Sequence, residues 1–151
     1  MGGGFGLVCC ADQVLAHASA QFATPEVTLG IVPAQIAPFG VRRLGPSAAR
    51  RCLLTGERWD AATAQRAGLI DEVVAGDTET AVQAAIARHA AAAPQAVAAT
   101  KRLLLAQPET PLPALLDAAA MAFAQALRGN EAPQGLVAFA ARKAPPWSAK
   151  P

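Results

Sequence analysis

The feature that most constrains the fold of this chain is a change of character near Gly76-Asp77. Before it, short apolar runs alternate with turns, whereas after it the chain is an alternation of helical stretches and proline-containing breaks. Four helices are predicted in this second part, over residues 78–93, 95–106, 112–128 and 135–142. We therefore expect two regions, a mixed α/β region over 1–76 and a helical region over 77–151.

The first region is predicted to contain short helices and three short strands. A glycine-led helix is predicted over 2–11. Thr24 is expected to cap a short helical turn that begins at Pro25 and ends at Gly30, because these residue types favour those positions. The other predicted elements are extended segments over 14–18 and 20–23, a helix over 35–44 kinked by Pro38 and Gly40, a helix over 48–54, a helix over 61–67 capped by Asp60 and closed by Gly68, and a strand over 69–74. Strands this short are rarely stable without more neighbours, so the region is expected to be the later part of a longer fold.

Composition excludes several classes of protein. Hydrophobic residues make up 53% of the 151 residues and charged residues only 16%. These values exclude a disordered chain and favour buried subunit contacts. The net charge is +2 and the basic residues are scattered, so a nucleic acid partner is not expected. No apolar run has the length that spans a bilayer, so no membrane role is expected. Three cysteines without C-x-x-C spacing predict neither a disulfide framework nor a zinc site, and a cytoplasmic location fits best.

A glycine cluster, Gly2-Gly3-Gly4-Phe5-Gly6, stands at the start of the first predicted helix. It does not fit the dinucleotide-binding pattern G-x-G-x-x-G, because Leu7 occupies the position of the last glycine. Unpaired N–H groups at a helix N-terminus favour a negatively charged oxygen, so an anion site is one interpretation. A flexible or tightly packed N-terminus is the other.

Glu26 is the candidate acid. It follows Pro25 and is surrounded in the sequence by apolar residues, and a carboxylate in apolar surroundings is suited to proton transfer near neutral pH. The alternative is an ordinary solvated glutamate. His17 and His89 have no carboxylate or cysteine at ligand spacing, so packing or surface roles are favoured for them and no metal site is expected.

Taken in order, a set of motifs along the whole chain resembles the crotonase, or enoyl-CoA hydratase/isomerase, family. These motifs are Gly2-Gly3-Gly4, Ala20-Gln21-Phe22, Pro25-Glu26, Leu29-Gly30-Ile31-Val32-Pro33, Arg43-Leu44-Gly45, Leu54-Thr55-Gly56, Ala67-Gly68-Leu69-Ile70, Pro94, Lys101 and the ending from Gly135 to Lys143. The resemblance implies the C-terminal part of a spiral of ββα units, followed by helices that assemble homotrimers, often paired into hexamers.

The resemblance also implies an acyl-CoA thioester substrate, whose enolate is held by two backbone N–H groups, and no separate cofactor. One donor matches Gly3, and the other belongs to a part of the family fold that precedes this chain. Gly2, Gly4, Gly6 and Pro25 are then expected to line the substrate site. Lys143 is expected to approach the nucleotide end of coenzyme A.

Of the two catalytic glutamates of the family, one matches Glu26 and the other falls on Gly6, which has no side chain. The glycine cluster and the segment 34–39 look like methylglutaconyl-CoA and isohexenylglutaconyl-CoA hydratases. We therefore expect a lyase that adds water to an α,β-unsaturated acyl-CoA. Two alternatives stay open: a Δ-isomerase that uses Glu26 alone, and a truncated fragment or assembly partner without activity, because Met1 stands where the family has the residue before its glycines.

Overall fold

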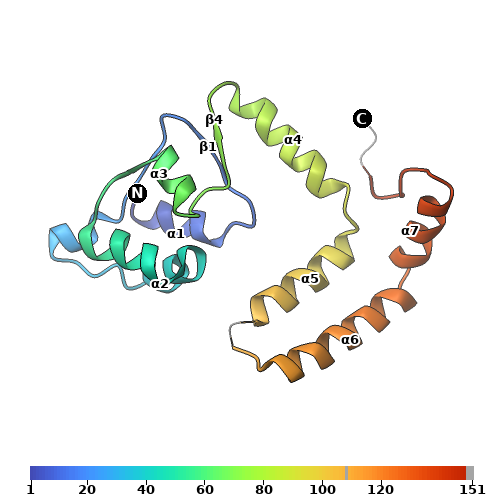
Figure 1. Ribbon diagram of the computed structural model, residues 1–151. Helices are drawn as coiled ribbons and strands as arrows, with labels where there is room; N and C mark the ends of the chain where they lie inside the picture. Colours follow the sequence, from blue (N-terminus) through green and yellow to red (C-terminus); the bar gives the residue numbers. More distant parts are fainter. Residues whose placement is uncertain (108, 149–151) are drawn as a thin grey trace. The chain divides into compact units, whose positions relative to one another are not determined.

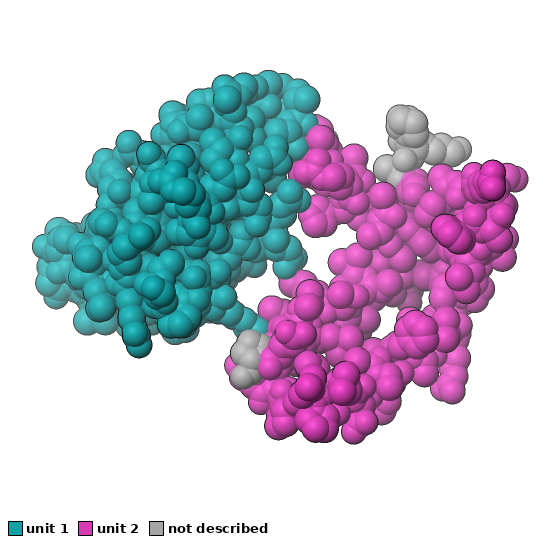
Figure 2. All heavy atoms as spheres, viewed as in Figure 1, with its two compact units in different colours: residues 1–82 teal, residues 83–151 magenta. Residues whose placement is uncertain are grey.

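The computed structural model describes residues 1–107 and 109–148 (Figure 1). The chain divides into two compact units, Met1–Val82 and Gln83–Pro151 (Figure 2). The division lies inside the helix α4 (Thr78–Ala90), and the boundary expected at residue 76 stays a prediction.

The elements follow one another along the chain with short connections. The first unit contains α1 (Gly3–Cys10), β1 (Leu15–His17), β2 (Gln21–Phe22), the 3-10 helix η1 (Pro25–Leu29), α2 (Ala37–Thr55), β3 (Trp59–Asp60), α3 (Ala61–Arg66) and β4 (Glu72–Val74). After α4 (Thr78–Ala90), the second unit contains α5 (Pro94–Ala106), α6 (Leu112–Arg128) and α7 (Glu131–Ala140). The expected order of a mixed α/β part and a helical part is confirmed.

The strands of the first unit form two separate pairs. β1 runs parallel to β4, with Ala16 opposite Val73, and β2 runs antiparallel to β3, with Phe22 opposite Trp59. β3 was not predicted, because so short a strand carries no periodic signal. Within the described residues each strand has a single neighbour, and two-stranded pairs are marginal by themselves.

The core of the first unit lies between α1, α2, α3 and the strands. Phe5, Trp59, Leu69 and Ile70 are each 2% exposed or less. Leu69 and Ile70 belong to this core rather than to a strand, so the strand predicted over 69–74 is shortened to β4. This packing ties α1 to the rest of the unit.

Thr24 differs from its predicted role. It occupies the N-cap position of η1, but its side chain makes no capping bond. Instead the fully buried Thr24 donates its hydroxyl to the carbonyl oxygen of Cys52 at 3.3 Å. The prediction of a side-chain cap is therefore wrong, because a buried hydroxyl must find a partner inside the core.

Two interruptions were predicted within 35–54: the break between the helices 35–44 and 48–54 is present, whereas the kink at Pro38 and Gly40 is absent. Pro38 lies at the start of α2, where its missing N–H costs nothing, and Gly40 is regular helix. The kink is at Gly45, which has φ 72° and ψ 166° and precedes Pro46. Gly40 is buried, and a Cβ there would lie 3.4 Å from Leu53 Cδ1, an ordinary van der Waals distance.

The ends of α3 agree with the sequence. Asp60 accepts the backbone N–H of Thr63 at 2.7 Å, and Gly68 follows the helix end with φ 81°. In contrast, α7 begins at Glu131, ahead of the predicted start at Gly135. Pro133 falls in the first turn of α7, where its missing N–H breaks no intrahelical bond.

The second unit has no apolar core of its own in α5, α6 and α7. None of these helices contains a buried residue among those described, although α6 packs against both α5 and α7. Phe123, Val137 and Phe139 are 68%, 70% and 83% exposed. Among the described residues, no helix combines the length and apolar character that crossing a membrane requires.

Candidate active site

The N-terminus of α1 is open to its surroundings. Gly3 and Gly4 are exposed, and apart from their chain neighbours and the backbone of α1 no described heavy atom lies within 4 Å of the position that a Cβ would take on either residue. No side chain caps the helix. Because Gly3 is the first residue of α1, its N–H has no intrahelical acceptor. This N–H is free to donate to an oxygen atom from outside the helix.

Gly2 holds this end of the helix in place. Its N–H donates to the carbonyl oxygen of Ala23 at 3.1 Å, and its own carbonyl accepts the N–H of Phe5 at 2.9 Å. Gly2 has φ 55° and ψ -129°. Residues with a side chain disfavour this conformation, and glycine adopts it without cost. The glycine is thus required where the start of α1 meets the chain that leads into η1.

Glu26 lies next to Gly2. Its backbone is fixed in η1, where its carbonyl oxygen accepts the N–H of Ile31 at 2.9 Å. A Cβ on Gly2 would lie 3.4 Å from Glu26 Oε1. The structure therefore brings together the glycine cluster and the acid, which are far apart in the sequence.

The second carboxylate oxygen, Glu26 Oε2, is buried. In the described part of the chain it has no hydrogen-bond partner, although the residue as a whole is half-buried. An unpaired buried acceptor costs about 1–3 kcal/mol, so such an atom in a folded protein calls for an explanation. A partner from outside the chain, such as a water molecule or a substrate, supplies one.

Pro25 and Gly6 define the neighbourhood of this pair. Pro25 begins η1, and its carbonyl oxygen accepts the hydroxyl of Thr28 at 2.7 Å. Gly6 is buried, and a Cβ there would lie 3.5 Å from Ile36 Cγ1. Ile36 therefore covers the face of α1 where a second acid would project. Ile36 was not identified as a site residue from the sequence, because the segment 34–39 was used only for its likeness to particular hydratases of the family.

Lys143 belongs to the second unit and follows α7. Its N–H donates to Ala138 O at 2.9 Å, and the preceding Arg142 has φ 53° and donates to Phe139 O at 3.0 Å. This is the pattern of a Schellman helix end, with arginine in the position that glycine usually occupies. The side chain of Lys143 is exposed.

The cysteines and His17 have no catalytic surroundings. Burial, with a smaller contribution from the neighbouring Cys10, raises the pKa of the Cys9 thiol to about 11, although Arg43 opposes the shift. Burial also raises the pKa of Cys52. His17 is exposed and contacts Ser19 Oγ at 2.7 Å through Nδ1. In residues 1–107 and 109–148, no group of three or more potential ligands gathers at a metal-binding distance.

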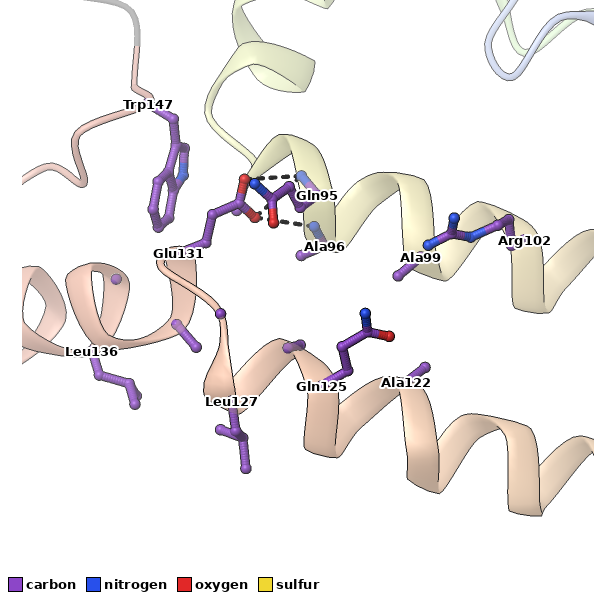
Figure 3. Close-up of a pocket in the computed structure, with 15 residues that line it drawn as sticks. Gln95, Ala96, Ala99, Arg102, Ala122, Gln125, Leu127, Glu131, Leu136 and Trp147 are labelled. Carbon is purple, nitrogen blue, oxygen red and sulfur yellow. Dashed lines mark hydrogen bonds between the residues drawn. The ribbon is translucent and has the colours of Figure 1, made fainter.

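A cavity of about 380 Å³ in the second unit was not predicted (Figure 3). Glu131 lies at its edge and accepts the N–H groups of Gln95 and Ala96 at 2.9 and 3.1 Å, so its carboxylate caps α5. Trp147 closes another side, since a Cβ on Gly135 would lie 3.0 Å from its ring. Most of the lining is apolar and comes from α5, α6 and α7.

Comparison with known proteins gives concordant results. Carnitinyl-CoA dehydratase of Proteus mirabilis is 32% identical over 99% of this chain and 59% of its own length. The 2,3-dehydroadipyl-CoA hydratase of Escherichia coli is 34% identical over 99% of this chain and 60% of its own length. The chain thus spans somewhat under two thirds of these relatives.

Solved structures agree. The enoyl-CoA hydratase/isomerase from Marinobacter aquaeolei has a TM-score of 0.95 and 42% identity, over 99% of this chain and 57% of that one. Pseudomonas aeruginosa AtuE has a TM-score of 0.94 and 47% identity, over 98% of this chain and 58% of that one. The family model for enoyl-CoA hydratase/isomerase matches residues 1–150. With this match and a mixed α/β, mostly helical crotonase-like fold, the chain belongs to the enoyl-CoA hydratase/isomerase family.

Proposed function

We propose that this chain contributes to an enoyl-CoA hydratase site, which adds water across the double bond of an α,β-unsaturated acyl-CoA. The observation that carries this proposal is the position of the Glu26 carboxylate, whose Oε1 lies 3.4 Å from the position that a Cβ would take on Gly2, at the open N-terminus of α1. Two relatives support the reaction type, because their names describe a dehydratase and a hydratase of CoA thioesters.

In this proposal the N–H of Gly3 donates to the thioester carbonyl oxygen of the substrate. That oxygen gains negative charge when the enolate forms, and the positive end of the α1 dipole favours the charge. One such preorganised donor lowers the barrier by roughly 3–4 kcal/mol. The exposed backbone of Gly3 and Gly4 would let the thioester approach closely. We assign Gly2, Pro25 and the buried Gly6, which lies beneath Ile36, to the same binding region.

Glu26 then carries out the proton transfers. Its carboxylate accepts a proton from water as the hydroxide oxygen bonds to the β-carbon and the electrons of the double bond move into the enolate. The protonated Glu26 returns the proton to the α-carbon, which restores the thioester and the free carboxylate. The unpaired Oε2 suits this role, because no described protein group competes for it.

The surface of the second unit supports the proposed assembly. The exposed apolar side chains of α6 and α7 suit contacts between copies in a cytoplasmic homotrimer or hexamer. Lys143 would approach the phosphates at the nucleotide end of coenzyme A. The likeness of residues 34–39 to methylglutaconyl-CoA and isohexenylglutaconyl-CoA hydratases supports a hydratase of that subgroup.

An isomerase is the second candidate, and Gly6 favours it. With Ile36 over Gly6, the helix α1 offers no second carboxylate, and moving a double bond needs only one acid to shuttle a proton. Glu26 would take the proton from the α-carbon and deliver it to the γ-carbon.

A chain without activity of its own is the third candidate. Each described strand has one neighbour, and the apolar side chains of the second unit are exposed, so further chain segments are needed to complete the packing. In that case the chain would neither bind coenzyme A nor turn over an enoyl-CoA.

One assay separates the three candidates. The 151-residue chain is incubated with trans-2-enoyl-CoA and, separately, with trans-3-enoyl-CoA, and the products are separated by chromatography. A 3-hydroxyacyl-CoA from the trans-2 substrate supports the hydratase. Conversion of trans-3-enoyl-CoA to trans-2-enoyl-CoA without hydration would contradict the hydratase and support the isomerase. No product from either, together with no binding of coenzyme A, would leave the third candidate.

A further inference from the structure

The side chain of Arg43 lies at the far end of α1 from the glycines. From α2, its Nη1 donates to the carbonyl oxygen of Ala11 at 3.3 Å, directly after the last residue of α1. Its Nε donates to the carbonyl oxygens of Gly68 and Leu69 at 3.1 and 3.2 Å. Arg43 thus joins the end of α1 to the turn after α3.

Asp71 completes the network. Its Oδ2 accepts Arg43 Nη2 at 2.8 Å and the N–H of Val14 at 2.7 Å. The Val14 carbonyl in turn accepts the N–H of Asp71 at 2.9 Å. The connection from α1 to β1 is therefore held at Ala11 by Arg43 and at Val14 by Asp71.

Arg43 and Asp71 are suited to fix the position of the C-terminal end of α1. The Arg43 side chain is only 15% exposed. Its planar guanidinium donates in several directions at once. A lysine keeps the charge and its attraction to Asp71, but it is a point charge that cannot reproduce this fork. An exposed surface pair contributes little by comparison.

The helix α1 carries this constraint to its other end. It has 8 residues, from Gly3 to Cys10. A helix of this size is rigid over a length of about 12 Å, so a tilt at Ala11 moves Gly3. At the N-terminus, the N–H of Gly2 donates a hydrogen bond to the carbonyl oxygen of Ala23, and Glu26 Oε1 lies beside the Cβ position of Gly2. A displacement of about 1 Å at a reacting group is enough to cost roughly 100-fold in rate.

We propose that Arg43 is a positioning residue, which fixes α1 so that the Gly3 N–H and the Glu26 carboxylate keep their mutual placement. The catalytic part of this inference rests on the proposed function. Arg43 touches neither Gly3 nor Glu26 and acts only through the helix.

The test compares Arg43→Lys with the control Arg50→Lys, an exposed arginine on the same helix, in the full chain. Amide hydrogen exchange is measured by NMR at Gly2 and Phe5, whose N–H groups donate to Ala23 and Gly2. We expect at least ~10-fold faster exchange in Arg43→Lys, because local opening of α1 costs less free energy once the hydrogen bonds of Arg43 to Ala11, Gly68 and Leu69 are lost. In enoyl-CoA turnover, kcat is expected to fall by roughly 10–100-fold with little change in KM.

The outcomes are distinct. If both lysine variants match wild type in exchange at Gly2 and Phe5, the inference is overturned, whatever the turnover. If the wild-type chain turns over no enoyl-CoA, the proposed function fails in this chain, and exchange alone decides the inference. If Arg43→Lys does not fold, Asp71→Asn is tested in its place. Faster exchange than wild type at Gly2 and Phe5 supports the inference, and exchange at the wild-type rate overturns it.

Discussion

Gly56 provides a sharp test of how the segment around Glu26 is packed. This residue ends α2 with φ 66° and ψ 16°. That is the left-handed conformation, which glycine favours. A Cβ there would meet Thr28 Cγ2 at 2.9 Å, Thr24 O at 3.3 Å and Pro25 Cα at 3.5 Å. The first two distances are shorter than comfortable contacts, and the second involves the backbone of a fully buried residue.

Gly30 is the matched control. It has φ 74° and ψ 18°, nearly the same conformation, but apart from its chain neighbours no described heavy atom lies within 4 Å of its Cβ position. Gly30→Ala therefore measures the conformational cost alone, about 1–2 kcal/mol. Gly56→Ala adds the cost of overpacking, about 1–3 kcal/mol, for a total of about 2–5 kcal/mol.

The assay is urea unfolding followed by tryptophan fluorescence. Trp59 is buried in the first unit and Trp147 lies in the second, so a Trp147→Phe background makes the signal specific for the first unit. We expect Gly56→Ala to lower the free energy of unfolding by at least ~1 kcal/mol more than Gly30→Ala. Equal losses in the two variants would refute the packing of Gly56 against η1.

Local structure yields three more expectations. Because burial raises the pKa of Cys9 from 9.0 to about 11, the neutral thiol stabilises the fold below pH 9, and this contribution is lost as the pH rises to 11. The free energy of unfolding of Cys9→Ala should therefore depend less on pH between 9 and 11 than that of wild type. The same pH dependence in both proteins would argue against burial of the thiol. Hydrogen bonds from Thr63 lower the pKa of Asp60 below 3.8, so Asp60→Ala should have a lower Tm than wild type at pH 7. This difference in Tm should shrink as the pH falls through the lowered pKa. A difference that does not change with pH would contradict the cap. Arg142→Gly relieves a positive φ. It should raise the free energy of unfolding of the second unit by about 1 kcal/mol, measured through Trp147 fluorescence in a Trp59→Phe background; a loss would count against the helix end described.

The sequence predicts those parts of the fold that depend on near neighbours. Asp60 and Gly68 mark the ends of α3 because capping involves residues within one turn. The hydroxyl of Thr24 could not be placed in this way, since its partner Cys52 lies far along the chain. The strand β3 escaped prediction for the same reason, because only its pairing with β2 defines it.

The candidate site, too, depends on residues that are distant in the chain. Spacing alone left Gly3 and Glu26 as separate and ambiguous features, and their expected proximity came from the family resemblance. The structure adds that Glu26 Oε1 lies beside the Cβ position of Gly2 and that Ile36 lies over that of Gly6. These contacts join segments that are distant in the chain, so no local pattern could reveal them.

The central claim is that Glu26 moves the proton in a CoA-thioester reaction. Its most direct test is the turnover of trans-2-enoyl-CoA by Glu26→Gln, with Glu109→Gln, an exposed glutamate in the second unit, as control. The substitution keeps the size of the side chain but removes the base, so kcat should fall by roughly 100–10,000-fold with an unchanged far-UV circular dichroism spectrum, while the control retains wild-type turnover. Near-normal hydration by Glu26→Gln would contradict the account.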